Sequence, residues 1–109
     1  MTAPGRFVIC VFRPLPGKED DLRAVLRDHL PTLRAEGLVT DREPYVMKAK
    51  DGAYLEVFEW RSDEAVRAAH GNPRVAELWK RFEAACTYEK LESVAEVGEM
   101  FPNFDAVEL

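Results

Sequence analysis

The stretch Tyr54–His70, with the sequence YLEVFEWRSDEAVRAAH, determines how the rest of the chain is organised. Its first half, Tyr54–Trp60, alternates between two faces at the period of a β-strand. One face is mostly aliphatic and suited to packing beneath helices: Leu55, Val57 and Glu59. The other face carries three aromatic rings around one carboxylate: Tyr54, Glu56, Phe58 and Trp60. The sequence therefore predicts a strand whose aromatic face contributes to any chemical site.

A helix is expected directly after this strand. Ser62 has the side chain of a helix N-cap, and the two acidic residues that follow it suit the positive end of the helix dipole. The helix is expected to continue to His70 and to end at the Gly-Asn-Pro sequence that follows. Asn72 then caps another helix with Pro73 at its first position. The second helical region is therefore predicted as two separate helices.

The remaining elements are predicted from apolar spacing. Phe7–Phe12 is a continuous apolar run typical of a strand, and a helix from about Lys18 to about Ala35 follows, in which Pro31 should cause a kink or end the regular part. Leu38–Lys50 is predicted as an irregular second strand, joined to the next by an Asp-Gly pair suited to a type I′ turn. Tyr88–Val97 is predicted as the last strand.

This order, β-α-β-β-α-β, predicts an α+β protein with the ferredoxin-like arrangement and a second helix broken in two. Residues 1–109 are expected to form a single domain, with residues 99–109 as an extended C-terminal tail. No polar residue interrupts Phe7–Phe12, so both faces of that strand need cover. Helices cover only one face of such a sheet, and we therefore expect a homodimer in which two sheets pair face to face.

Composition excludes several classes of protein. The chain has 109 residues and a formal net charge of −5, and its basic residues alternate with acidic ones, which argues against binding to nucleic acid. The run Phe7–Phe12 is too short to span a membrane and lacks the features of a signal peptide. Cys10 and Cys86 form neither a disulfide framework nor a metal-ligand cluster, so we expect reduced thiols in a cytoplasmic protein without a bound metal.

Three segments carry a resemblance to a known family: PGK at 16–18, AEG at 35–37 and EWRSDEAVRAAHGNPRV at 59–75. From about Phe7 to about Val97 the chain resembles the antibiotic biosynthesis monooxygenase-like family of the dimeric α/β-barrel superfamily. The positions that match best are Gly17, Gly37, Trp60, Ser62, Ala65, His70 and Pro73. The resemblance implies a dimeric barrel and, in part of the family, oxidation of anthrones or quinols by O₂ without a cofactor. The haem-degrading branch is set aside, because this chain lacks that branch's residues at the matching positions.

His70 and Glu56 are the candidate catalytic residues. An imidazole exchanges a proton near neutral pH, as a general base must, but His70 could equally be a helix-end residue that interacts with the dipole and the last carbonyl groups. Glu56 stands on an aromatic face, where a buried carboxylate needs a partner or a raised pKa. It could act as a base, position a substrate hydroxyl, pair with an arginine such as Arg13 or Arg42, or lie at a wet rim.

The rings of Tyr54, Phe58 and Trp60 are candidate substrate contacts. They could form the wall of a pocket for a flat aromatic or quinol-type molecule, or they could simply fill the barrel. The sequence therefore supports two hypotheses about function. The first is a cofactor-independent monooxygenase-like enzyme acting on a small aromatic or quinol-type compound. The second is a protein of the same dimeric fold that binds a small hydrophobic ligand without chemistry.

Overall fold

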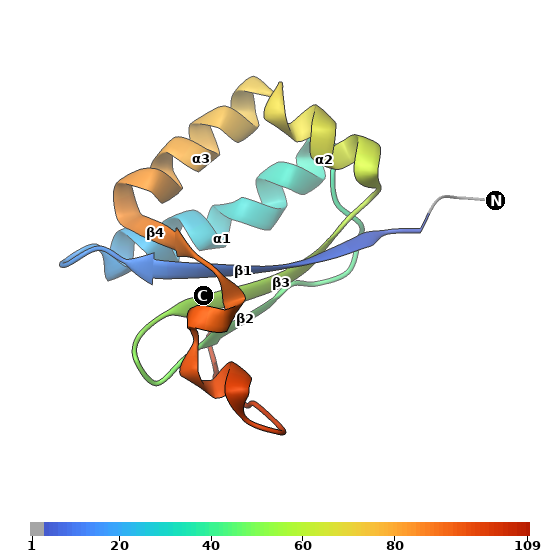
Figure 1. Cartoon of the computed structure of the whole chain (residues 1–109). Helices are drawn as coiled ribbons and strands as arrows, with labels where there is room; N and C mark the ends of the chain where they lie inside the picture. Colours follow the sequence, from blue (N-terminus) through green and yellow to red (C-terminus); the bar gives the residue numbers. More distant parts are fainter. Residues whose placement is uncertain (1–3) are drawn as a thin grey trace.

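The computed structural model describes residues 4–109, so residues 1–3 of the predicted domain lie outside the described part. In Figure 1 the helices lie on one side of an antiparallel sheet, and the C-terminal segment lies on the other. The elements follow in the order β1 (Arg6–Pro14), α1 (Glu19–Ala35), β2 (Tyr45–Lys48), β3 (Tyr54–Trp60), α2 (Asp63–His70), α3 (Pro73–Ala85), β4 (Cys86–Glu89), η1 (Leu91–Ser93), η2 (Ala95–Gly98) and β5 (Asp105–Ala106). The predicted α+β, ferredoxin-like order with a divided second helix is confirmed.

The sheet has five strands in the order β4-β1-β3-β2-β5, and every neighbouring pair is antiparallel. The long central pair is β1 and β3, in which Cys10 lies opposite Glu56 and Phe12 lies opposite Tyr54. The fifth strand comes from the C-terminal tail, where Asp105–Ala106 adds to the free edge of β2. The site is therefore built on the two central strands, where neighbouring strands hold the backbone on both sides.

The two caps predicted around α2 and α3 are confirmed. The hydroxyl oxygen of Ser62 accepts a hydrogen bond from the backbone N–H of Ala65, at 3.1 Å. The side-chain oxygen of Asn72 accepts hydrogen bonds from the N–H groups of Arg74 and Val75, and Pro73 is the first residue of α3. These side chains satisfy donors that a helix start leaves unpaired, so α2 and α3 begin where the sequence specifies.

Helix α1 and the hairpin differ from the prediction in detail. Pro31 lies inside α1 without ending it at Leu30, because apolar residues continue to face the sheet as far as Leu33. The turn between β2 and β3 is not type I′, which requires positive φ at both central residues. Gly52 has a positive φ, of 99°, but Asp51 does not. The Asp51 carboxylate instead accepts a hydrogen bond from the Ala53 N–H.

The faces of β3 are the reverse of the prediction. Helices cover the aromatic face, where Tyr54, Phe58 and Trp60 join the main core with apolar side chains of α1 and α3. The aliphatic face looks away from the helices, and its Leu55 packs with residues of the C-terminal segment. Aromatic rings bury more apolar surface than the aliphatic side chains on the other face, so this face gains more from full cover by the helices.

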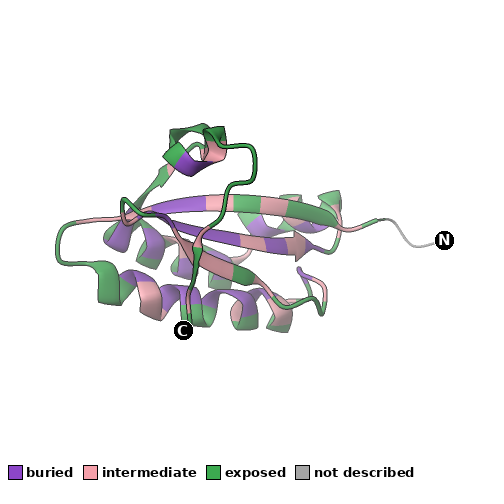
Figure 2. Cartoon of the chain, turned by 90° about the horizontal axis from the view of Figure 1, so that it is seen from below, coloured by how far each residue is buried: buried purple, intermediate pink, exposed green. Residues whose placement is uncertain are grey.

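The predicted last strand is also shorter than expected. β4 ends at Glu89, and the chain then forms two 3₁₀ turns, η1 and η2, across the face that the helices leave open (Figure 2). Val94 of this segment packs with Val11 and Leu55, while Phe7, Ile9 and Tyr45 on that face stay exposed. The second strand is likewise limited to Tyr45–Lys48. The C-terminal segment thus covers one half of the open face.

Candidate active site

A cavity of about 370 Å³ lies between β1, β3, β4 and helix α3. Its wall contains six aromatic rings: Phe12, Phe58, Trp60, Trp79, Phe82 and Tyr88. The same wall contains one imidazole, that of His29, which α1 brings to the sheet within its apolar stripe. A mostly apolar cavity with a few placed polar groups is the usual form of a site for a small molecule.

His29 and Glu56 form a buried pair. The Nδ1 atom of His29 lies 2.6 Å from the Oε1 atom of Glu56, and the two residues are 4% and 0% exposed. The second carboxylate oxygen, Oε2, has no hydrogen-bond partner among residues 4–109. Glu56 does not itself line the cavity, so the imidazole separates the carboxylate from the space that a ligand would occupy.

Two phenylalanines fix the plane of the imidazole. The rings of Phe58 and Phe82 meet the His29 ring edge to face, with centroids 5.2 Å and 4.9 Å away. The hydrogen bond to Glu56 fixes the rotation of the ring within that slot. His29 therefore has one defined orientation, and Nε2 is the ring nitrogen left for a ligand.

The other ionisable groups on the cavity wall are poor proton acceptors at neutral pH. Burial and the charge of Glu56 raise the pKa of the Cys10 thiol to about 12. Burial also raises the pKa of Tyr88 to about 12. Glu89 is held by Arg13, whose hydrogen bonds keep the pKa of that carboxyl below its usual range. Glu83 is exposed at the rim. These groups therefore leave His29 as the residue suited to accept a proton.

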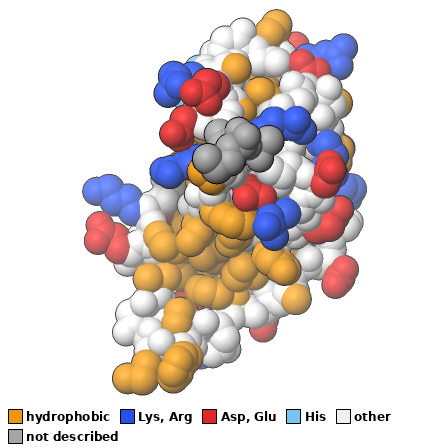
Figure 3. Space-filling model, turned by 90° about the vertical axis from the view of Figure 1, so that its right-hand side faces the viewer, with side chains coloured by type: hydrophobic (Ala, Val, Ile, Leu, Met, Phe, Trp, Pro, Cys, Tyr) orange, Lys and Arg blue, Asp and Glu red, His pale blue; other side chains and the backbone are white. Residues whose placement is uncertain are grey.

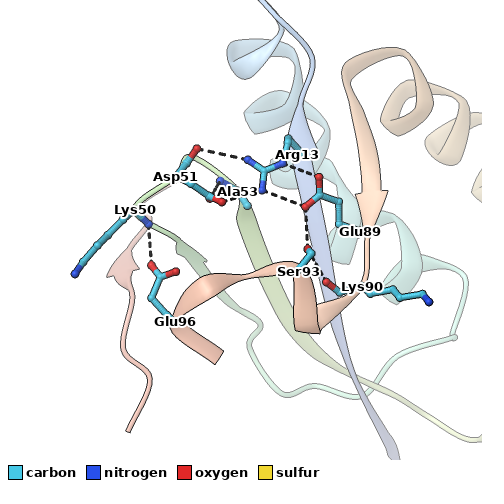
Figure 4. Close-up of polar contacts among 8 residues, drawn as sticks. All are labelled: Arg13, Lys50, Asp51, Ala53, Glu89, Lys90, Ser93 and Glu96. Atoms are coloured by element: carbon cyan, nitrogen blue, oxygen red, sulfur yellow. Dashed lines mark hydrogen bonds and ion pairs between the residues drawn. The ribbon is translucent and has the colours of Figure 1, made fainter. Parts of the chain in front are cut away.

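Arg13 joins the cavity wall to the C-terminal segment (Figure 4). Its guanidinium donates to both oxygens of Glu89, at 2.6 and 3.1 Å, and to the Asp51 carboxylate at 2.9 Å. Glu89 also accepts a hydrogen bond from the Ser93 hydroxyl in η1. Further along the chain, the buried Glu96 accepts a hydrogen bond from the backbone N–H of Lys50. These contacts fasten the C-terminal segment to the hairpin and to β4.

The geometry offers no metal site and no membrane helix within the part of the chain that the structure describes. Residues 4–109 contain no group of three or more His, Cys, Asp or Glu side chains placed to hold a metal ion. None of the described helices is long and apolar enough to cross a membrane.

Comparison with known proteins bears on the fold. No protein-family model matches the chain, and no curated protein matches its sequence. Among solved structures, the chain is similar to SnoaB, a cofactor-independent oxygenase from Streptomyces nogalater. The TM-score is 0.65 and the identity 16%, and the match covers 80% of this chain and 88% of SnoaB. It is also similar to Rv0793 from Mycobacterium tuberculosis, with a TM-score of 0.60 and 26% identity over 74% of this chain and 82% of Rv0793. The chain therefore shares the fold of these two structures.

Within this fold, the predicted site residues occupy different places. Phe58 and Trp60 line the cavity. Tyr54 lies outside the cavity wall, fully buried, with its hydroxyl bonded to Glu19 at 2.7 Å. Glu56 lies behind His29 and pairs with that residue, not with the arginines considered in the sequence. Of the three predicted aromatic contacts, two therefore face the cavity.

His70 is not brought together with Glu56. It is exposed at the end of α2, and its ring lies edge to face against Trp79 with a centroid distance of 5.2 Å. Trp79 lines the cavity and His70 does not, so His70 reaches the site only through that indole. His70 and the aromatic face of β3 thus do not line the same cavity in this structure, and the catalytic role of His70 stays a prediction.

His29 is the site residue that the sequence analysis did not select as a candidate. Its position in the apolar stripe of α1 is the common place for a structural histidine, and nothing local distinguishes it. The usable signal was the combination of two anomalies, a histidine on a buried helix face and a carboxylate on a buried strand face. Each needs a partner when buried, and each is the partner of the other.

Proposed function

We propose that this protein is a cofactor-independent oxygenase-like enzyme that acts on a small aromatic or quinol-type compound. The observation that carries the proposal is the cavity of about 370 Å³ with six aromatic rings and one imidazole in its wall. This volume lies at the small end of the range for ligand sites, and flat rings stack well against aromatic walls. The similarity of fold to SnoaB, an oxygenase described as cofactor-independent, supports the same reaction type.

The reaction needs an electron-rich substrate anion. Loss of a proton from a phenolic or benzylic position gives an anion that can reduce O₂ directly, without a metal or a flavin. For an anthrone-type substrate, one oxygen atom replaces two hydrogens on the ring carbon as a carbonyl, and the other leaves as water. Phe58 and Trp60 are proposed to contact the substrate ring, because both line the cavity. Tyr54 is proposed to join β3 to α1, because its hydroxyl already donates a hydrogen bond to Glu19.

We further propose that the protein is a homodimer formed through the uncovered half of the sheet. Phe7, Ile9 and Tyr45 point away from the helices and are 63%, 48% and 71% exposed. Figure 3 shows hydrophobic side chains gathered over one area of this side of the molecule. Phe7, Tyr45 and Val57 also border a hollow of about 250 Å³. A contiguous apolar surface of this kind is typical of an interface, and a second copy offers the complementary surface.

A second candidate function is binding of a small hydrophobic ligand without chemistry, in a cytoplasmic protein. The observation in its favour is that the Glu56 carboxylate is already bonded to a protein group and does not face the cavity. The free thiols of Cys10 and Cys86 support the cytoplasmic location.

Oxygen consumption tests these proposals. Purified protein is supplied with an anthrone and with simple quinols, and O₂ uptake above the rate without protein is measured with an electrode. We expect uptake with at least one of these compounds. Binding without uptake, measured by fluorescence of Trp60 and Trp79, would instead support the ligand-binding function.

The catalytic role that the sequence suggested for His70 is tested in the same assay. If His70 were the base, His70→Ala would lower the rate about a hundredfold or more. Because His70 lies outside the cavity behind Trp79, we expect a change of less than about threefold. Arg67→Ala, on an exposed position of the same helix, is the matched control.

A further inference from the structure

We propose that His29 is the proton acceptor of this site and that Glu56 is its positioning residue, so that the cavity takes a ligand with a weakly acidic hydroxyl group and binds it as the anion. The proposal rests on the proposed function for the later reaction with O₂. The proton transfer itself requires only the cavity and the His29–Glu56 pair.

The hydrogen bond to Glu56 determines which nitrogen of His29 can accept a proton. In the proposed arrangement Glu56 is the ionised partner, and because an ionised carboxylate can only accept hydrogen bonds, the Nδ1 atom, 2.6 Å from Oε1, then carries the hydrogen. The neutral imidazole then has its lone pair on Nε2. No residue in the described part of the chain hydrogen-bonds Nε2, while the ring lines the cavity. The acceptor atom is therefore available to a ligand.

Burial leaves the Glu56 carboxylate with His29 as its hydrogen-bond partner. The carboxylate is 0% exposed, and its Oε2 atom has no hydrogen-bond partner among the described residues, so water and protein give it little compensation. A positive charge on the adjacent ring is the strongest compensation at hand in such a medium. A proton that arrives at Nε2 converts a charge beside a neutral ring into an ion pair. This is the role of the carboxylate in a catalytic triad.

The surroundings of the pair leave no competing base. The other ionisable groups that line the cavity are Cys10 from β1, Glu83 from α3, and Tyr88 and Glu89 from β4. Burial raises the pKa of the Cys10 thiol and of the Tyr88 hydroxyl to about 12, so both groups stay protonated at neutral pH. Glu89 is bonded to Arg13, and Glu83 lies in solvent at the rim.

The proposed step is a simple proton transfer. The O–H bond of a phenol or enol breaks, its electron pair stays on the oxygen, and an N–H bond forms at Nε2 of His29. The anion then lies beside the His29 imidazolium, whose ring Phe58 and Phe82 contact edge to face. A methyl ether of the same ring lacks the proton and should lose this stabilisation.

The test uses 4-nitrophenol, whose ionised form absorbs at longer wavelength than its neutral form. Binding is followed by absorbance at a pH about one unit below the pKa of the free phenol, where about a tenth is ionised. With wild-type protein, we expect the ionised share of the bound phenol to rise about fivefold or more over the free phenol. 4-Nitroanisole, the methyl ether, should bind more weakly.

Four variants separate the roles. His29→Gln should bind 4-nitrophenol in its neutral form. Glu56→Gln should lower the ionised share, because an amide can donate to Nδ1 and so reverse the tautomer, while Glu56→Asp should restore part of it. The double variant His29→Leu with Glu56→Leu replaces the pair by apolar side chains, which keeps the buried site free of an unpaired charge. It should fold and bind the neutral phenol only.

The outcomes decide the proposal. Equal ionised shares in wild type and His29→Gln, or a bound phenol that stays neutral in wild type, would overturn it. These measurements need no O₂ and are thus independent of the oxygenase proposal. Ionisation by wild type without O₂ uptake from any substrate would reject the oxygenase function and leave the proton acceptor in place. O₂ uptake that persists in His29→Gln would reject the proton acceptor and leave the function in place. The expected loss of that rate is about a hundredfold or more.

Discussion

The two faces of β1 carry the same type of residue in different surroundings. Phe12 points toward the helices, is 3% exposed and stacks on Phe82 with ring centroids 4.7 Å apart. Phe7 points to the opposite face and is 63% exposed. Both are apolar residues of one continuous run, and the apolar character of the run does not distinguish them. What distinguishes them is the cover that distant parts of the chain provide.

The two faces of β3 repeat this comparison with carboxylates. Glu56 faces the helices and is buried with His29, whereas Glu59 on the open face bonds the exposed Arg42 and the hydroxyl of Thr40. A pair in a dry site can alter the proton affinity of its members, while a pair that water reaches contributes little. The helix face of β3 therefore carries the groups suited to proton transfer, and the open face carries the surface suited to association.

The largest expected effect tests the difference between the two faces of β1, through the free energy of unfolding of two variants. Phe12→Ala should lower the free energy of unfolding by about 3–5 kcal/mol, because it leaves a void in a closed core. Phe7→Ala should change it by about 0.5 kcal/mol or less when the protein is monomeric. Urea titration of both variants at low protein concentration measures the two values. Similar losses at the two positions would show that the open face is covered in solution.

The next largest effect concerns association. Ile9→Asp places a charge in the centre of the proposed interface and should weaken dimerisation about a hundredfold or more, because the carboxylate would be buried without a partner. Analytical ultracentrifugation measures the shift. Ala76→Asp, at an exposed position of α3, is the matched control and should leave the dimer intact. A wild-type protein that sediments as a monomer would contradict the proposed homodimer.

The smallest effect concerns the polar contacts around Arg13, which join β1 to Glu89 and, through Ser93, to the C-terminal segment that also packs on the sheet by apolar contacts. Hydrogen bonds from Arg13 and Ser93 keep the pKa of Glu89 below its ordinary 4.5. The backbone N–H of Ala53 and then Arg13 keep that of Asp51 below 3.8. Because these pKa values are lower in the folded chain, the contacts stabilise it above those ordinary values, and the benefit is lost as the pH falls through the lowered ones.

Arg13→Gln removes the cation from this cluster. We expect the wild type to lose more stability between pH 7 and pH 3 than the variant does, as measured by urea titration at each pH. Arg67→Gln, which affects only an exposed ion pair within α2, should keep the pH dependence of the wild type. An unchanged pH dependence in Arg13→Gln would show that the cluster does not hold the segment.

Local signals predicted the elements well. The caps at Ser62 and Asn72 and the alternation of β3 depend on neighbours within a few residues, and these elements form where the sequence placed them. The last strand was predicted too long, because the apolar residues after β4 serve a 3₁₀ segment that packs on the sheet, a distinction that period alone does not make.

The site was less predictable because it depends on distant contacts. Glu56 was identified from its unusual neighbours, but its partner comes from α1, 27 residues earlier in the chain. Each face of β3 carries one carboxylate, so the pattern could not show which face the helices would cover. His70 matched a family position, yet its place at the end of α2 keeps it outside the cavity.

The neighbour of Glu56 across the sheet, Cys10, has a further consequence. Its thiol lines the cavity, and burial together with the carboxylate raises its pKa to about 12. At pH 7, only about one thiol in 10⁵ is then ionised, and the thiolate is the form that adds to electrophilic rings such as quinones. Burial, with a smaller contribution from the carboxylate that orients the acceptor, thus keeps the adjacent sulfur inert, which would protect an oxygenase from alkylation by its own product.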